Sequence, residues 1–164
     1  MISEPFRPTK LTLVFLLLSA MMILMGGAAV APALPLISEA FPDAPEYLIS
    51  LIVTLPSLAI GVTGIFIGLL SDRIGKIKIL AASIVIFTIA GTSGYFLNSI
   101  YAILIGRFIL GVGIAGITCA TSSLIPCYYE GITRAKVLGY QGAAMGFGVL
   151  ILEISGGLLS GISW

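Results

Sequence analysis

Charged side chains are scarce in this sequence, and four of them gather in one short stretch. Only 9% of the 164 residues are charged. The segment GLLSDRIGKIKIL (68–80) nevertheless contains Asp72, Arg73, Lys76 and Lys78. Basic residues beside an apolar run anchor it at a membrane surface, and anchoring needs no acid. The acid therefore indicates that this stretch is more than an anchor.

Two glycines bracket the charged pair at 72–73. We expect Gly68 to let a neighbouring helix approach closely and Gly75 to supply the positive φ of a tight reversal. Asp72 should face the positive end of the following helix, and Arg73 the carbonyl groups that end the preceding one. The alternative is that the whole cluster is a simple membrane anchor.

Two further charges, Arg107 and Glu153, lie inside long apolar runs. An ionisable residue within a membrane span is costly, so each is a candidate functional residue. At 1.5 Å per residue, Arg107 lies roughly 9 Å, and Glu153 roughly 6 Å, from one edge of the hydrocarbon core. We expect them to make contact in at least one state, with Arg107 attracting an anionic or polar group and Glu153 carrying a proton. A static ion pair, or an Arg107 side chain that extends to the headgroups, is the alternative.

The composition excludes several classes of protein. Hydrophobic residues make up 59% of the chain, whereas soluble domains are about 25% charged, so this is a membrane protein. A net charge of +1 predicts no nucleic-acid partner, and the chain has no histidine. Two cysteines, Cys119 and Cys127, indicate no disulfide framework or zinc site. The stretch GVGIAG (111–116) spells a dinucleotide fingerprint, but it lies within a spanning helix. We expect no enzyme, cofactor or metal.

Hydropathy divides the chain into a tail at 1–10 and a transmembrane domain at 11–164. A spanning helix needs about 20 mainly apolar residues. The first apolar run is too long for a signal peptide, and Pro126 with the polar stretch after it should end the fourth. The five expected spans are 11–34, 47–70, 79–97, 101–124 and 137–162.

The basic residues predict the orientation of these spans. Seven of the eight fall on one side of the predicted membrane. By the positive-inside rule that side is cytoplasmic, which makes this a multi-pass protein of the cell (inner) membrane with a cytoplasmic N-terminus. The seven are Arg7, Lys10, Arg73, Lys76, Lys78, Arg134 and Lys136.

The loop between the second and third spans resembles the signature loop of the major facilitator superfamily, G-x-L-S-D-R-x-G-K-x-K. Ile77 stands where a basic residue is common. The matching residues are Gly68, Leu70, Asp72, Arg73, Gly75, Lys76 and Lys78. The resemblance implies a conformational-switch loop made by Gly68, Asp72, Arg73, Gly75 and Lys76.

Three other spans carry motifs similar to those of this family. The first, MGGAAVAPALP, resembles the L-G-x5-P-x-x-P pattern of its drug:proton antiporters, although it carries no acid. The fourth resembles a motif of the family in which an arginine embedded in the membrane is followed by glycines. The fifth resembles an antiporter motif in part, since Leu152 and Glu153 replace an expected Gly-Pro. The matching residues are Gly26, Pro32 and Pro35, then Arg107, Gly111 and Gly113, then Gly148, Gly156 and Gly157.

The remaining glycine pairs have the spacing of helix-packing faces. They occur in GIFIG (64–68), GAAMG (142–146) and GLLSG (157–161). Small residues four apart let membrane helices approach closely. We therefore expect most of these glycines to contact neighbouring helices rather than substrate.

The family resemblance implies twelve spans in two six-helix halves that alternate access to a central cavity. The expected fold class is an all-α integral membrane protein of about five transmembrane helices, an incomplete N-terminal six-helix half. The expected function is secondary active efflux of drug-like or amphipathic compounds. Alternatives are metabolite uptake, or a truncated fragment or packing subunit without transport activity. Expected partners are the lipid bilayer, a small-molecule substrate with a proton as candidate co-substrate, and the missing C-terminal helices of the carrier.

Overall fold

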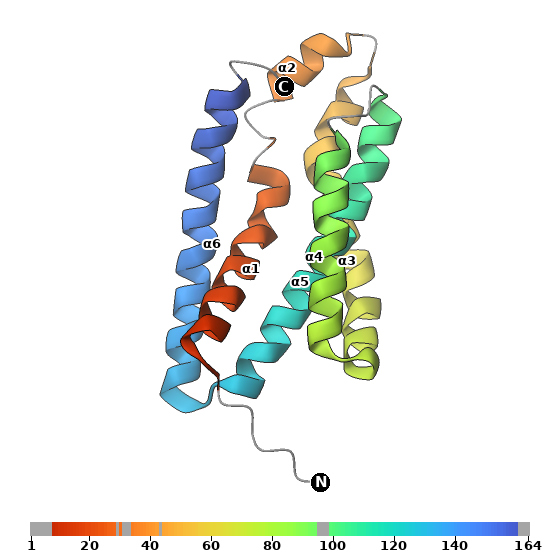
Figure 1. The fold of residues 1–164 in the computed structure, drawn as a ribbon. Coiled ribbons are helices and arrows are strands. Elements are labelled where there is room, and N and C mark those ends of the chain that lie inside the picture. Colours follow the sequence, from red (N-terminus) through yellow and green to blue (C-terminus); the bar gives the residue numbers. More distant parts are fainter. Residues whose placement is uncertain (1–7, 29, 31–33, 43, 95–98, 161–164) are drawn as a thin grey trace.

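The computed structural model describes residues 8–28, 30, 34–42, 44–94 and 99–160. These residues form a bundle of long helices with one short helix across an end (Figure 1). The helices are α1 (Lys10–Ala28), α2 (Leu34–Ala40), α3 (Glu46–Ile74), α4 (Lys76–Ser93), α5 (Ile100–Tyr128) and α6 (Gly131–Ser160). The expected all-α class is confirmed.

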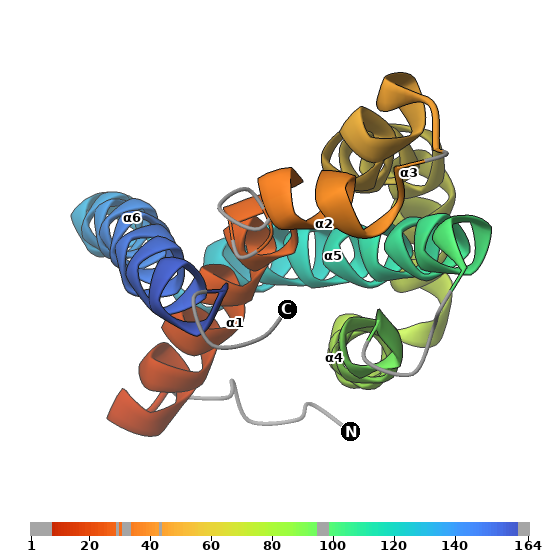
Figure 2. The same cartoon turned by 90° about the horizontal axis from the view of Figure 1, so that it is seen from above.

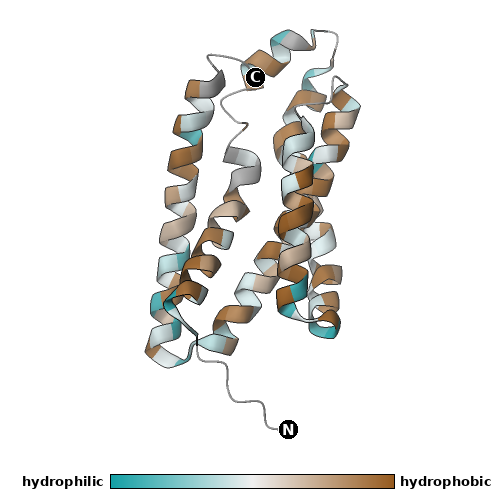
Figure 3. Ribbon diagram, viewed as in Figure 1, coloured by the Kyte–Doolittle hydropathy of each residue, from teal (hydrophilic) through white to brown (hydrophobic). Residues whose placement is uncertain are grey.

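Four of these helices, α3 to α6, are long and apolar enough to cross a membrane. The apolar part of α1, Lys10–Leu24, is shorter. Apolar residues fill the middle of the long helices, and polar residues gather at their ends (Figure 3). Many large apolar side chains point outward, as lipid requires, and Phe66 on α3 is 68% exposed. The molecule is therefore a multi-pass membrane protein.

Helix α5 is the centre of the bundle. It packs along α3 and α4, and less extensively along α1. Helix α6 lies apart from α3 and α4 and packs almost entirely on α1, as the view along the bundle shows (Figure 2). Most of the largest fully buried side chains among the described residues therefore belong to α5, among them Ile114, Ile117 and Ile125.

Three glycines allow α5 to pack this closely. A methyl group on Gly111 would lie 2.6 Å from the carbonyl oxygen of Pro56 in α3. On Gly113 it would lie 2.9 Å from the backbone nitrogen of Phe87 in α4, and on Gly116 it would overlap Ser83. Real Cβ atoms do not approach so closely, so the expectation that the glycines of 111–116 pack helices is confirmed.

The other glycine faces do not pack in this way, which corrects the expectation for them. A Cβ added at Gly64, Gly68, Gly142, Gly146 or Gly157 would meet no atom of the described residues within 4 Å. Four-residue spacing shows only that two small residues share a helix face, and neighbouring helices decide whether that face is covered. In particular, no described helix approaches Gly68.

The first predicted span, 11–34, is divided in the structure. Helix α1 ends at Ala28, and residues 34–40 form the separate helix α2. The sequence VAPALP (30–35) explains the division, because proline lacks the N–H that a continuous helix needs. Helix α2 is held by Ile37, which packs with Leu48 and Ile100 at the ends of α3 and α5. Pro32 lies outside the described residues, and Pro35 is exposed in α2.

The later helices extend beyond the predicted spans on the side of the basic residues. Helix α5 continues through Pro126 to Tyr128, and α6 begins at Gly131 rather than 137. Pro126 lacks the N–H that a continuing helix needs, and α5 ends two residues after it, at Tyr128. Hydropathy marks the lipid-covered length of a helix, and polar turns can extend past it.

Candidate transport site

The reversal between α3 and α4 consists of one residue, Gly75. Its φ is 107° and its ψ is 136°, and its N–H donates a hydrogen bond of 3.0 Å to the carbonyl oxygen of Ser71. L-residues rarely adopt this backbone conformation, so a side chain here would be strained. The predicted positive φ is confirmed. A second left-handed glycine, Gly131 with φ 52°, joins α5 to α6 and was not predicted from the sequence.

The charged pair before Gly75 belongs to the last turn of α3. Arg73 lies at the carbonyl end of that helix, where a cation is favourable, as expected. Asp72 is exposed and lines the same pocket as the start of α4, but no side chain caps α4 by a hydrogen bond. Asp72 is therefore available for a partner outside the described residues.

Lys76 ties the start of α4 to the end of α5. Its Nζ donates hydrogen bonds to the carbonyl oxygen of Ser123 at 3.2 Å and to the Sγ of Cys127 at 3.0 Å. A lysine near the carbonyl end of a helix satisfies acceptors that the helix itself leaves free. No local sequence pattern predicts this contact, because the partners lie 47 and 51 residues away.

The two embedded charges lie at comparable heights but on helices that do not pack together there. Arg107 is half-buried, seven residues after the start of α5, and Glu153 is exposed, seven residues before the end of α6. These two helix ends lie at the same end of the bundle (Figure 1). Within the described part of the chain Glu153 forms no hydrogen bond or ion pair, so contact with Arg107 stays a prediction for another state.

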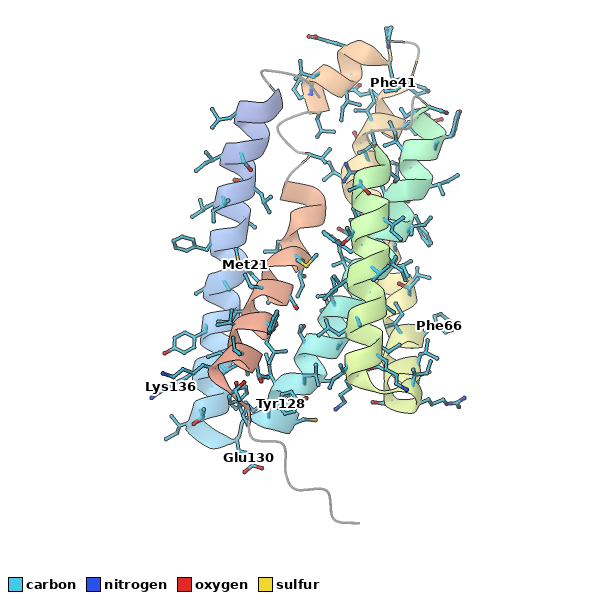
Figure 4. The ribbon with its side chains drawn as sticks, viewed as in Figure 1. Met21, Phe41, Phe66, Tyr128, Glu130 and Lys136 are labelled. Carbon is cyan, nitrogen blue, oxygen red and sulfur yellow. The ribbon has the colours of Figure 1, made fainter. Side chains whose placement is uncertain are left out.

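The fifth-span glycines have different surroundings. Gly148 is buried, and a Cβ there would lie 3.2 Å from the Cβ of Met21, which Figure 4 shows on α1. Gly156 is half-buried and Gly157 is exposed. In the first-span motif, Gly26 belongs to α1. Gly148 is thus the member of these motifs with a demonstrated packing role.

One end of the molecule carries most of the described basic side chains. The labels in Figure 4 place Tyr128, Glu130 and Lys136 at this end, where the α3–α4 reversal also lies. Apolar residues of α1, α5 and α6 close the bundle there, with Tyr129 packed against them. Burial raises the pKa of the Tyr129 hydroxyl above its ordinary value.

Comparison with known proteins agrees with this geometry. The sequence profile of the Major Facilitator Superfamily matches residues 16–164. The chain belongs to the major facilitator superfamily. In this member of the superfamily, the charged reversal joins α3 to α4. The half-buried Arg107 lies in α5.

Relatives in this superfamily include several transporters. The chain is 27% identical to the inner membrane transport protein YajR of Escherichia coli over 84% of the chain and 30% of YajR. It is 24% identical to the quinolone resistance protein NorB of Staphylococcus aureus over 96% of the chain and 34% of NorB. It is 32% identical to a probable 4-methylmuconolactone transporter of Cupriavidus pinatubonensis over 52% of the chain and 20% of that protein. The chain spans about a third of the length of YajR and NorB.

Helix contacts in this chain include two similar pairs, α3 with α5 and α1 with α6. Half-bundles of such transporters consist of two three-helix units of opposite orientation. If α1 corresponds to α5 and α3 to α6, the close α3–α5 pair has its counterpart in the α1–α6 pair. The second helix of each unit therefore packs on the first helix of the other, which explains why α6 lies on α1 rather than on α5.

Proposed function

We propose that this chain is part of a secondary transporter that moves a small solute across the cell membrane by alternating access. The observation that carries the proposal is the one-residue reversal at Gly75, with Asp72, Arg73 and Lys76 around it, in a chain of this superfamily. A single-residue connection transmits movement of α3 directly to α4. Lys76 passes the same movement to the end of α5.

In this transporter the exposed Asp72 contacts a partner segment of the carrier in one state and releases it in the other. Gly75 shapes the reversal, and Arg73 and Lys76 hold the helix ends. Arg107 attracts a polar or anionic group within the membrane, and Glu153 carries a proton during antiport. The basic end of the bundle faces the cytoplasm, which places the N-terminus there.

Efflux of amphipathic, drug-like compounds is the favoured class of transport. Support comes from the first-span motif around Gly26 and from the similarity to NorB, which extends over nearly the whole chain. Apolar, weakly charged helices also suit an amphipathic solute. Uptake of a metabolite is the second candidate, because the 32% identity to the probable 4-methylmuconolactone transporter covers half of the chain.

The test is accumulation in bacteria that lack their main efflux pumps and express the natural gene encoding this chain. We expect cells with the wild-type protein to accumulate less of a fluorescent quinolone and of ethidium than cells with Arg107→Gln at equal membrane abundance. Dissipating the proton gradient should abolish the difference, because antiport depends on it.

Two other results would contradict efflux. Faster uptake of a labelled lactone or aromatic acid, with unchanged quinolone levels, would assign the protein to metabolite import. If the protein transports neither class of compound at normal membrane abundance, the remaining candidate is a packing subunit. Pull-down of a stable helical partner would then identify the role of that subunit.

A further inference from the structure

The long helices fall into two groups. Helices α3 and α4 both pack on α5, and we call these three helices the α5 group. Helices α1 and α6 pack on each other, and we call them the α1 group. Figures 1 and 2 show α1 and α6 on one side of the molecule and α3 and α4 on the other, with α5 crossing from the first side toward the second. The two groups meet mainly along a seam between α1 and α5.

Close backbone contacts and polar ties hold the α5 group together. Gly111 of α5 lies so close to the backbone of Pro56 in α3 that a methyl group would not fit between them. The thiol of Cys119 in α5 donates a hydrogen bond of 3.5 Å to the carbonyl oxygen of Gly64 in α3. On the other side, Lys76 ties α4 to the end of α5. Interlocked backbones cannot shift without losing such contacts, so these three helices should move as one body.

The seam between the two groups is made of apolar side chains. Leu16 of α1 packs with Leu124 and Ile125 of α5 at the basic end of the bundle, where the α3–α4 reversal also lies. Farther along α1, Met22 and Ile23 pack against the apolar cluster of α4 and α5. Apolar contacts are non-directional, so side chains can shift across such a seam more easily than interlocked backbones can.

The α1 group is fastened to α5 at the basic end. Val137, near the start of α6, is buried there in one cluster with Leu16 and Leu124. Two residues separate α5 from α6, and α6 begins at Gly131, which has a φ of 52° and no described atom within 4 Å of a Cβ placed on it. Glycine adopts backbone angles that other residues avoid, so this connection is suited to a pivot. At the opposite end, which we call the far end, Leu158 of α6 is 71% exposed.

The two embedded charges belong to different groups. Arg107 lies in the α5 group, seven residues after the start of α5, and Glu153 lies in the α1 group, seven residues before the end of α6. Both are therefore near the far end, where rotation about the basic end gives the largest displacement. Opposite charges attract more strongly inside a membrane protein than in water. An ionised pair would thus favour an arrangement in which the two groups approach each other.

We propose that α1 and α6 pivot as one body about the basic end, which closes the far end of the seam and brings Glu153 to Arg107. The described structure is the open and more populated arrangement, and the closed one is a minor state. This movement takes place within one half-bundle, in addition to the movement of whole bundles against each other. Its role in transport rests on the proposed function, but the movement itself can be measured without transport.

The experiment measures distances between pairs of spin labels in the product of the natural gene, purified into nanodiscs, with Cys119 and Cys127 replaced by serine. Labels on Ile89 of α4 and Leu158 of α6 report across the seam at the far end. They should give one main distance and a shorter one in a minor fraction of molecules. Labels on Ile89 and on Tyr47 of α3, both in the α5 group, are the control and should give a single distance. The three labelled side chains are 64–71% exposed, so the labels should not disturb packing.

A charge variant with a matched control tests whether the embedded pair makes the closed arrangement. Glu153→Gln should lower the ratio of the shorter to the longer distance about fivefold, the effect of one partly exposed ion pair. Glu46→Gln removes an exposed acid at the start of α3, also at the far end, and should leave the ratio unchanged. Glu153 is exposed as well, so its replacement should not affect folding.

Three outcomes would overturn the proposal. A single distance across the seam would show that α1 and α6 do not move against α5, even if the protein transports solute. Two distances for the control pair would show that the α5 group is not one body. An unchanged ratio in Glu153→Gln, or an equal fall in Glu46→Gln, would show that closure does not bring Glu153 to Arg107. Two distances across the seam in a protein that transports neither class of compound would support the movement and reject only the proposed function.

Discussion

At the scale of single residues, glycines carry much of the information, but they do so in two ways. Gly75 is needed for its backbone conformation, since its φ of 107° is unfavourable for other residues. Gly111 is needed for its lack of a side chain, since the backbone of Pro56 lies against it. Gly64 and Gly142 have neither constraint. Alanine substitutions therefore distinguish three kinds of glycine: one needed for its backbone conformation, one packed against another helix, and one with neither constraint.

Gly111→Ala should destabilise the protein by about 1–3 kcal/mol, because the added methyl group would force α3 and α5 apart. The measurement is the thermal unfolding midpoint of the detergent-purified protein. Gly142→Ala is the matched control, in open space on α6, and should change the midpoint little. Equal midpoints for the two variants would mean that α3 and α5 pack less closely than described here.

Asp72→Asn should impair transport while leaving membrane abundance near that of the wild type. Asp72 is exposed and forms no hydrogen bond among the described residues, so the folded bundle does not depend on its charge. Transport is measured by the accumulation assay and abundance by immunoblot of membranes. Glu130→Gln, an exposed acid at the same end of the molecule, is the control. Full transport by Asp72→Asn would reduce the charged reversal to a membrane anchor.

At the scale of elements, the bundle is organised by pairs of helices rather than by chain neighbours. Helix α5 packs closely on α3 and α4, whereas α6, which follows it directly, packs on α1. Lys76 adds a polar tie between α4 and α5 at the basic end. The two embedded charges are thus on helices that belong to different pairs.

This separation predicts how Arg107 and Glu153 respond to mutation. Arg107→Gln should lower stability more than Glu153→Gln, because Arg107 is half-buried and Glu153 is exposed. The two effects on the unfolding free energy should add within about 0.5 kcal/mol, as for distant residues. If the two charges meet in another state, each single variant already breaks that contact. The double variant should then lose little more transport activity than either single variant.

A double-mutant cycle on thermal stability and on transport rate measures both quantities. Arg107→Lys is a suitable additional variant, because it keeps the charge and removes the planar guanidinium. Strong coupling in the stability cycle would contradict the helix arrangement described here. Additive effects on transport would show that the two residues act independently.

At the scale of the whole molecule, the distribution of charge relative to the membrane is the main feature. The helix ends near the α3–α4 and α5–α6 connections are polar, and the middle of the bundle is apolar (Figure 3). Basic residues at these two connections should remain in the cytoplasm during insertion. This asymmetry alone predicts the orientation.

Fusions of a reporter that is active only in the cytoplasm test this orientation. Reporters placed after Lys78 and after Lys136 should be active, and those after Asp43 and after Asn98 should be inactive. A second reporter, active only outside the cytoplasm, should give the opposite pattern at the same four positions. Inverted results with both reporters would place the basic end outside and exclude the proposed orientation.

The sequence by itself determined the membrane class, the approximate spans and the reversal at Gly75. Apolar runs of about 20 residues and a glycine between charged helix ends are local features, and local physics suffices to interpret them. The family resemblance also rested on short motifs. These predictions failed mainly at helix ends, as at Ala28 and Pro126, where hydropathy and hydrogen bonding give different boundaries.

Tertiary structure alone decided which small residues are packed and which polar groups meet. Gly68 and Gly111 look alike in the sequence, yet only Gly111 has a helix against it, because coverage depends on which helices pair. The contacts of Lys76 with Ser123 and with Cys127 arise in the same way. Each joins segments far apart in the chain, and helix periodicity carries no information about such distances.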